Sequence, residues 1–504
     1  IGTITVTGDA STTSVTTVQS AAIAAVSSGT IGRIGVINGA VNILDANRAS
    51  TTAAGTIATA DVTSGAAVVV NSGALTTLNA AGTFTTVNAG TLGALTTAAN
   101  TTLALNLTGA VSTGAVTIDT DITTLNISGN TTTSTIASLV ASGATTINVS
   151  GDALVTLTAN TTAAVTDIVV TNTAGAAFGS ALAVGVNFAG GAGDDSIVLT
   201  GAQTKAITMG AGNDTVTYAG ALSTTVGSVG SVAAGTGTAD TIIMTGAQAD
   251  AADASSVFNT AFTGFEVLQL SNAMTVTVDL DGVNAANKVI LAAGSNGGTI
   301  NNLISGGTVQ INADAAGALA VGIDGAVSRS TDVLNLNLNK STLLVANTIT
   351  AANVETINIT APDAITALLA TGGTTLLGSA AAINTLGLAA TSATSVVVTG
   401  NNGLTLTNTG NVAITNFDAS GVVANDTAAS TFVAATTDTA ANLAVTFAST
   451  NITAAADVTI KGGAGNDTLT GTIAKDTISG NAGIDTIYSD NAGNKTAFAT
   501  ANVT

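Results

Sequence analysis

The sequence contains no cysteine, no histidine and no tryptophan. Without cysteine there are no disulfides and no thiol chemistry, which fits a reducing compartment or a bacterial exoprotein built without such crosslinks. Without histidine, Ser-His-Asp triads and histidine-bound metals are excluded as well. Paired carboxylates still allow glycoside hydrolysis, but with 10 Phe and 2 Tyr no platform for stacking sugar rings is visible. We therefore expect that the protein is not an enzyme.

Positive charge is also scarce, because 9 Lys and Arg face 29 Asp and Glu, for a net charge of -20. Phosphate binding needs clustered basic residues, so nucleic acid is not expected as a partner. No apolar run approaches the roughly 18 residues of a membrane span, so membrane insertion is not expected either. The sequence starts at Ile1 without a signal peptide, and we expect export to depend on a segment outside it, such as a removed terminus.

The residues that are present favour strands in a repeated fold. At 504 residues and 47.9 kDa, the chain is longer than one compact core usually needs, so several domains or an elongated repeat are expected. Its 46% hydrophobic content comes mostly from small and β-branched residues, with one proline, Pro362. Such residues favour thin stacked layers of strands over helices or proline-rich disorder.

An irregular repeat runs through the first third of the chain, in which apolar and polar residues alternate and the segment ends near Asn and Gly. The copies are LTTLNAAG (75–82), FTTVNAG (84–90), LALNLTG (103–109), ITTLNISG (122–129) and TTINVSG (145–151), with Asn79, Asn88, Asn106, Asn126 and Asn148 in equivalent places. A period near 20 residues predicts an all-β, parallel β-solenoid, whose asparagines form ladders at the turns. The alternative is a string of β-sandwiches, which would not pair its strands in parallel.

The glutamates Glu266, in GFEVLQLS, and Glu355, in NVETINIT, occupy matching contexts and indicate an internal repeat. Each has two interpretations, a capping role at the start of a strand or a metal ligand. The fragment DLDG (279–282) resembles the start of an EF-hand loop but lacks its later ligands, so we interpret it as a turn.

A sharper repeat appears in KGGAGNDTLTGTIAKDTISGNAGIDTIYSD (461–490), where Asp467, Asp476 and Asp485 recur at every ninth position. The pattern G-G-x-G-x-D-x-U-x, where U is a large apolar residue, fits GGAGNDTLT (462–470) and GGAGDDSIV (190–198). MGAGNDTVT (209–217) lacks only the first glycine, and GTGTADTII (235–243) is a weaker match. These segments add Asp195, Asp214 and Asp240 as candidate metal ligands.

Two nonapeptides make one coil of about 18 residues, so Asp467 should stack over Asp485, and Asp195 should lie near Asp214. Two carboxylates about 4 Å apart repel by roughly 4 kcal/mol at an effective dielectric of about 20. Carboxylates and turn carbonyls together form an all-oxygen cage, which Ca²⁺ prefers. The alternative is that these Gly-Asn-Asp clusters are merely turn residues; the regular spacing favours calcium.

Calcium would then be part of the fold. A site with a dissociation constant near 10 μM stabilises the folded state by roughly 2.7 kcal/mol in about 1 mM calcium. In a calcium-poor cell interior these segments should stay unfolded, which favours export as an unfolded chain to an extracellular location.

The nonapeptides resemble those of the RTX exoproteins, which bacteria export by type I secretion. The longer stretches STIASLVASGATTINVSGDALVTLTANTTAAVTDIVVTNTAGA (134–176), FAGGAGDDSIVLTGAQTKAITMGAGNDTVT (188–217) and SVVVTGNNGLTLTNTGNVAITNFDASGV (395–422) are similar to the calcium-dependent surface-layer (S-layer) proteins of the Caulobacter type. By the family's motif, Asp195, Asp214, Asp467, Asp476 and Asp485 bind calcium, and the turn glycines are Gly191, Gly193, Gly210, Gly212, Gly463 and Gly465.

This resemblance implies a two-dimensional protein lattice on the outside of a Gram-negative cell, with this chain as its lattice-forming portion. It also implies contact with lipopolysaccharide through a region that this chain does not contain. The expected regions are an irregular solenoid (1–185), two RTX-type calcium-binding segments (186–245 and 456–504) and a β-rich lattice-forming region (246–455).

The leading hypothesis is therefore a secreted structural protein that self-assembles into a surface layer at the cell surface. One alternative is a secreted RTX adhesin, or a filament or biofilm matrix protein, on the same scaffold. Another is binding to ice or to another surface through Thr-x-Thr arrays such as TITVT (3–7) and LTLT (404–407), which requires a flat, long and uninterrupted ladder.

Overall fold

The computed structural model describes the strands and coils of most of the chain. The described residues are 3–5, 14–19, 29–34, 40–45, 55, 57–90, 100–220, 230–340, 342–362, 368–369, 376–377, 382–424, 438–451, 457–489 and 497–501. The chain divides into two compact units, one of residues 1–242 and 257–265 and the other of residues 243–256 and 266–504.

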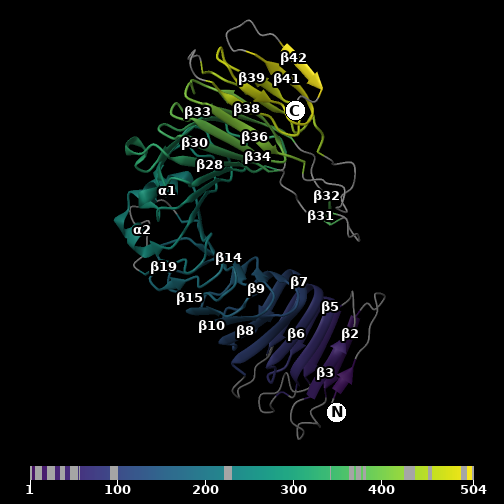
Figure 1. The fold of residues 1–504 in the computed structure, drawn as a ribbon. Helices are drawn as coiled ribbons and strands as arrows, with labels where there is room; N and C mark the ends of the chain where they lie inside the picture. Colours follow the sequence, from purple (N-terminus) through teal and green to yellow (C-terminus); the bar gives the residue numbers. More distant parts are fainter. Residues whose placement is uncertain are drawn as a thin grey trace. The chain divides into compact units, whose positions relative to one another are not determined.

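Strands of the first unit pair in parallel, with each strand lying beside one from the next coil. They are β1 (Thr3–Thr5), β2 (Ser14–Gln19), β3 (Gly29–Ile34), β4 (Ala40–Asp45), β5 (Ile57–Asn71), β6 (Thr77–Gly90), β7 (Thr102–Ile118), β8 (Thr124–Gly129), β9 (Ser134–Val140), β10 (Thr146–Gly151), β11 (Val155–Leu157), β12 (Asn160–Thr161), β13 (Asp167–Val170), β14 (Ala176–Leu182), β15 (Asn187–Ala189), β16 (Ser196–Leu199), β17 (Ile207–Thr208), β18 (Thr215–Tyr218), β19 (Val232–Ala233) and β21 (Phe262–Thr263). The prediction of a parallel β-solenoid is confirmed, and Figure 1 shows β5 to β8 side by side.

Coils of the first unit shorten between β8 and β18, whereas Asp214 and Asp240 of the next coil lie 26 positions apart. Equivalent residues lie 22 positions apart between β8 and β10, then 21, then 20, and 19 between the aspartates that precede β16 and β18. Early coils use long strands, because β7 pairs with β8 through its first half and with β9 through its second half. The five repeat asparagines lie within strands rather than at turns, which corrects the prediction. Four of them form two separate rungs, in which Asn106 donates to Asn79 and Asn148 donates to Asn126.

The second unit has parallel strands in two sheets. One sheet contains β22 (Val267–Leu270), β24 (Lys288–Leu291), β26 (Thr308–Ile311), β28 (Val333–Leu338), β30 (Thr356–Ala361), β34 (Ser395–Gly400), β36 (Asn416–Val422), β38 (Thr459–Lys461) and β40 (Thr477–Ser479). The other contains β23 (Thr277–Asp279), β25 (Thr299–Leu303), β27 (Leu319–Ile323), β29 (Val345–Thr350), β33 (Ile383–Ala389), β35 (Gly403–Asn408), β37 (Val445–Ala448), β39 (Thr468–Thr470), β41 (Ile484–Tyr488) and β42 (Ala497–Ala501). Strand β42 pairs antiparallel with β41, and β31 (Leu368–Leu369) pairs antiparallel with β32 (Leu376–Leu377).

The core of each unit is a narrow layer between facing strands. In β8 the buried positions are Leu125 and Ile127, and the intervening polar residues face outward, as the alternation predicts. In the second unit Phe417 on one sheet stacks on Phe447 of the other, with ring centroids 3.9 Å apart. Both rings are fully buried, and burial of such a side chain contributes about 1.5 to 3 kcal/mol. A core this thin explains why large aromatic residues are rare in the sequence.

Helical structure was not expected from the sequence, and two short α-helices follow residue 245. The helix α1 (Gly246–Asp253) begins with a capping box between Thr245 and Gln248, and α2 (Ser256–Ala261) follows. Short 3₁₀ turns lie at Leu280–Gly282 and Ala326–Ser328. No described helix has the length and apolar character needed to cross a membrane.

A threonine ladder runs along the second sheet of the second unit. Successive strands place Thr385, Thr405, Thr446, Thr468 and Thr486 in register. Two positions further along each strand, Gly387 pairs with Thr407, and Ala448 pairs with Thr470, which pairs with Tyr488. Thr405 of the LTLT motif lies in the threonine column, whereas Thr407 pairs with Gly387. A continuous Thr-x-Thr array is therefore not formed there. In the TITVT motif, residues 6 and 7 lie outside the described residues.

Candidate metal centre

Three aspartates of the first unit form a stack where consecutive strands begin. Asp195 precedes β16, Asp214 precedes β18, and Asp240 precedes β20 (Thr241–Met244). The backbone N–H of Asp195 donates to Oδ1 of Asp214 at 2.7 Å, and the N–H of Asp214 donates to Oδ1 of Asp240 at 2.8 Å. The carboxylates of Asp214 and Asp240 therefore each link the start of their own strand to the backbone of the preceding coil. The predicted proximity of Asp195 and Asp214 is confirmed, and the weaker match at Asp240 lies in the same stack.

The second unit repeats this arrangement at Asp467 and Asp485. The N–H of Asp467 donates to Oδ1 of Asp485 at 2.9 Å, while Oδ1 of Asp467 accepts from the N–H of Val445 at 2.7 Å. The second oxygen of Asp467 accepts from the N–H of Gly463. Both aspartates are 1% exposed. The predicted stacking of Asp467 over Asp485 is confirmed.

Asp476 lies between them in sequence but on the other sheet, where it precedes β40. Its Oδ1 accepts from the N–H of Val458 at 3.0 Å, and its carboxylate also accepts from the hydroxyl of Thr472. Asp476 is half-buried, in contrast to Asp467 and Asp485. Alternate nonapeptides thus enter alternate sheets, which confirms the prediction of two nonapeptides per coil.

Burial makes the stacked carboxylates difficult to ionise without a counterion. Burial raises the pKa of Asp214 to about 7, and the negative charges of Asp195, Asp240 and Asp194 add to the effect. Burial likewise raises the pKa of Asp467 to about 7, with a contribution from the charge of Asp485. Hydrogen bonds from backbone N–H groups oppose both shifts without overcoming them. A cation beside these groups would stabilise their charged forms.

The donor set fits calcium. Oδ2 of Asp214 is buried and has no hydrogen-bond partner in the part of the chain that the structure describes, so it is free to face a cation. Among the described residues, no group of three or more acidic side chains could hold a metal by itself. Backbone carbonyl oxygens must then supply the remaining ligands, in keeping with the preference of Ca²⁺ for oxygen donors. Candidate ligands remain Asp195, Asp214, Asp240, Asp467, Asp476 and Asp485.

The turn glycines have two different roles. Gly210 and Gly212 have φ values of 103° and 120°, in the region that favours glycine. Gly193 and Gly465 do not, but a Cβ there would lie 2.1 Å from the nitrogen of Gly175 and 2.3 Å from the carbonyl carbon of Leu443. Close approach between stacked coils explains these two glycines. Gly191 and Gly463 are crowded in the same way, although less severely.

The residue before each aspartate forms a second ladder that the sequence interpretation missed. Oδ1 of Asp194 accepts from the N–H of Asn213 at 2.7 Å, and Oδ1 of Asn466 accepts from the N–H of Ile484 at 2.8 Å. Here the earlier coil accepts from the later one, opposite to the direction of the aspartate stack. In the sequence, this ladder could have been predicted from the polar residue that directly precedes each aspartate, as in Asp194-Asp195 and Asn466-Asp467.

Neutral asparagines occupy a similar capping position upstream in the second unit. Oδ1 of Asn384 accepts from the N–H of Leu344 at 2.9 Å, and Oδ1 of Asn411 accepts from the N–H of Ala390. Both asparagines are fully buried. Because an amide carries no charge, these coils obtain the same backbone cap without needing a cation.

The two glutamates occupy equivalent positions in their coils. The backbone carbonyl of Glu266 accepts from the N–H groups of Asn287 and Lys288, and that of Glu355 accepts from Thr394 and Ser395. The side chain of Glu355 accepts from the N–H of Asp332 at 2.8 Å, which favours its capping role. The DLDG fragment forms a 3₁₀ turn capped by the Asp279 side chain, as interpreted from the sequence.

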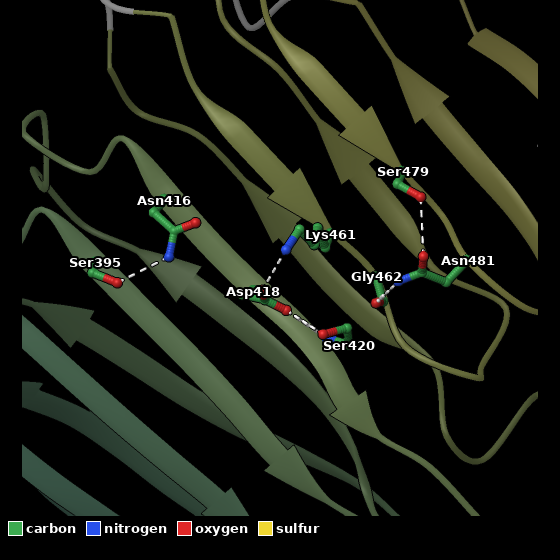
Figure 2. A network of polar contacts seen from close by, with 8 residues as sticks. All are labelled: Ser395, Asn416, Asp418, Ser420, Lys461, Gly462, Ser479 and Asn481. Carbon is green, nitrogen blue, oxygen red and sulfur yellow. Dashed lines mark hydrogen bonds and ion pairs between the residues drawn. The ribbon is translucent and has the colours of Figure 1, made fainter. Parts of the chain in front are cut away.

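Polar contacts on the outer face join the last coils of the second unit to the strands before them (Figure 2). Lys461 on β38 forms an ion pair of 2.8 Å with Asp418 on β36. Asn481 donates to the carbonyl of Gly462 at 2.6 Å, and Asn416 donates to the hydroxyl of Ser395. An ion pair this exposed contributes at most about 1 kcal/mol, so it serves mainly to fix the register of β38 on β36.

Comparison with known families identifies the type of repeat that contains the second aspartate stack, that of Asp467 and Asp485. A family model described as the RTX calcium-binding nonapeptide repeat, in four copies, matches residues 457–490. The chain carries RTX calcium-binding repeats. Calcium is therefore the cofactor of this RTX segment, which contains Asp467, Asp476 and Asp485. None of the curated proteins searched matches the chain.

The RTX segment also indicates where the protein acts and what kind of protein it is. RTX repeats indicate a secreted, extracellular protein. A β-solenoid built from RTX repeats is typical of non-enzymatic structural proteins. The first aspartate stack follows the same nonapeptide pattern but lies outside the matched residues.

Proposed function

We propose that this chain is a structural protein that assembles with copies of itself into a calcium-dependent two-dimensional surface layer on the outside of a bacterial cell. The observation that carries the proposal is the pair of buried aspartate stacks, one in each unit, represented by Asp195 with Asp214 and by Asp467 with Asp485. Each stack needs a cation to be stable in its ionised form. Folding of both units would then depend on extracellular calcium.

Net charge supports a link between calcium and assembly. With 29 acidic residues against 9 basic ones, copies of the chain repel one another at neutral pH. Calcium bound at the stacks and at the surface lowers this repulsion. Assembly would therefore begin outside the cell, where calcium both completes the fold and allows copies to approach.

The test is to follow the oligomeric state and order of the purified chain with calcium, with magnesium and with EGTA. Light scattering and electron microscopy should show ordered sheets in calcium and monomers in the other two conditions. Sharp diffraction from the sheets distinguishes a surface layer from an adhesin, which would fold in calcium and remain monomeric. Ordered sheets that persist in EGTA, or monomers in calcium, would contradict the proposal.

A further inference from the structure

A groove of about 650 Å³ lies on the outer face of the first unit, far in sequence from both aspartate stacks. Its walls come from β5, β6, β7 and β8, which lie side by side (Figure 1). Along it, one polar side chain from each coil stands in register: Asp61, Asn79, Asn106 and Ser128. Successive coils are about 4.8 Å apart, so polar groups repeat at that spacing along the groove.

These side chains form a hydrogen-bond chain in which every donor points the same way. Asn130 donates to the hydroxyl of Ser128, which donates to Oδ1 of Asn106 at 2.8 Å. Asn106 donates to Oδ1 of Asn79 at 2.7 Å, and Asn79 donates to the carboxylate of Asp61. Hydrogen bonds in such a chain polarise one another, so the groups are held in fixed orientations.

The chain leaves unused hydrogen-bonding capacity at each coil. An asparagine amide has two N–H groups and two acceptor sites, and the chain uses one donor and one acceptor of Asn79 and of Asn106. Both side chains are half-buried and line the groove, beside the exposed Thr108. Val62 and Ala80 also border the groove, but their side chains are 2% and 6% exposed and face the core. The groove therefore offers fixed donors and acceptors at regular spacing.

This lining excludes several kinds of ligand. It contains no lysine or arginine, so phosphate groups have no counterion there. Its one carboxylate, Asp61, already accepts from an amide, which is an unsuitable arrangement for a metal cage. It has no aromatic or large flexible side chain to hold a lipid tail. A polymer that carries hydroxyl groups at regular spacing and no negative charge fits all three restrictions.

We propose that this groove binds a segment of neutral polysaccharide, lying along the coil axis across β5 to β8. Hydroxyl groups of the sugar pair with the amide positions of Asn79 and Asn106 that the hydrogen-bond chain does not use. Binding is weak, because no aromatic ring is present for stacking. The proposal is independent of surface-layer assembly, since it concerns another face and no calcium ligand.

The experiment is affinity electrophoresis of the full chain, in calcium, through native gels that contain dextran, mannan, galactomannan or the acidic polymer alginate. Retardation by at least one neutral polysaccharide, and none by alginate, is expected. The variant Asn106→Ala removes the central rung and should weaken retardation about five- to tenfold, as the loss of one or two hydrogen bonds gives. The matched control Asn148→Ala breaks an equivalent 2.7 Å rung outside the groove and should leave retardation unchanged.

A second variant tests the groove without breaking the hydrogen-bond chain. Ala81 lines the groove on β6, and Ala81→Phe should fill it and abolish retardation while circular dichroism stays unchanged. If Asn106→Ala does not fold, the retardation of Ala81→Phe alone tests whether the groove binds polysaccharide. The proposal is overturned if no neutral polysaccharide retards the chain, if alginate retards it equally, or if Ala81→Phe binds as well as the natural sequence.

Discussion

The backbone N–H of Asp467 donates a hydrogen bond of 2.9 Å to Oδ1 of Asp485, one coil further along the chain. The same relationship joins Asp195 to Asp214. Each carboxylate thus has two separable properties: it accepts a backbone hydrogen bond, which needs no charge, and it carries a buried negative charge, which needs a cation. Replacing aspartate by asparagine removes the second property and keeps the first.

Asp214→Asn should make the protein more stable in the absence of calcium. An amide oxygen can still accept from the N–H of Asp195, and no donor faces Oδ2 of Asp214 among the described residues. With the pKa of Asp214 at about 7, its ionisation at about pH 8 costs the calcium-free fold on the order of 4 kcal/mol. Urea unfolding in EGTA, followed by circular dichroism, should show a higher midpoint for the variant. In calcium the natural sequence should have the higher urea midpoint, because the variant lacks one carboxylate ligand.

Two matched variants show whether charge or geometry is responsible. Asp194→Asn changes the neighbouring carboxylate, which is exposed, and should leave the midpoint in EGTA nearly unchanged. Asp467→Asn should gain less than Asp214→Asn, because its new NH₂ group would face the N–H of Gly463. Equal midpoints for all three variants in EGTA would be inconsistent with a role for buried charge.

Stability without calcium should fall as pH rises. The folded-state pKa of Asp214 and of Asp467 is about 7, above the ordinary value of 3.8, so the folded state binds more protons than the unfolded state between these values. In calcium-free buffer the urea midpoint should therefore decrease from about pH 4 to about pH 7. The increase in midpoint on adding calcium should grow over the same range, because calcium competes with protons. A midpoint that rises with pH in calcium-free buffer would contradict this.

Asn411→Asp should destabilise the second unit whether or not calcium is present. Asn411 is fully buried, and its Nδ2 donates to the carbonyl of Leu388 at 2.8 Å. A carboxylate there would place an oxygen against that carbonyl and add a buried charge without a partner, at a cost of about 3 kcal/mol or more. Unfolding in calcium and in EGTA measures the effect. Rescue by calcium would show that Asn411 lies in an additional metal site.

Gly210→Ala should disrupt the first aspartate stack. Gly210 has a φ of 103°, and a Cβ there would lie 2.2 Å from the carbonyl oxygen of Gly191. A loss of about 2 kcal/mol or more is expected, together with weaker calcium binding. The control is Gly185→Ala, where a Cβ meets nothing within 4 Å and the midpoint should stay within about 0.5 kcal/mol. Calorimetric titration of both variants with calcium provides the comparison.

The stacks could be predicted from the sequence because each nonapeptide has a fixed length. With strands of three residues and turns of constant size, as at β38, β39 and β40, sequence spacing converts directly into spatial register. The Asp467 and Asp485 relationship followed from counting alone. Strand alternation likewise predicted which residues face the core, as Leu125 and Ile127 show.

Irregular coils could not be resolved in this way. Equivalent residues of neighbouring coils in the first unit lie between 18 and 27 positions apart, so equal spacing does not identify residues in the same row. Asn106 therefore pairs with Asn79, while Asn126 pairs with Asn148. The alternation of buried residues in β7 is interrupted at residues 108–109 and 113–115, so a strand of that length did not follow from the sequence pattern. The helix α1 has only weak sequence signals, of which the Thr245 and Gln248 capping box is one.

Amide hydrogen exchange of the whole chain, with and without calcium, tests the central claim most directly. If calcium between coils completes the fold, peptides from residues 190–217 and 457–489 should exchange at least about tenfold more slowly in calcium, a difference of about 1.4 kcal/mol. Peptides from the neutral strands β33 and β35 should change much less. Equal exchange in calcium and in EGTA at Asp467 and Asp485 would show that these coils fold without the ion and would contradict the account.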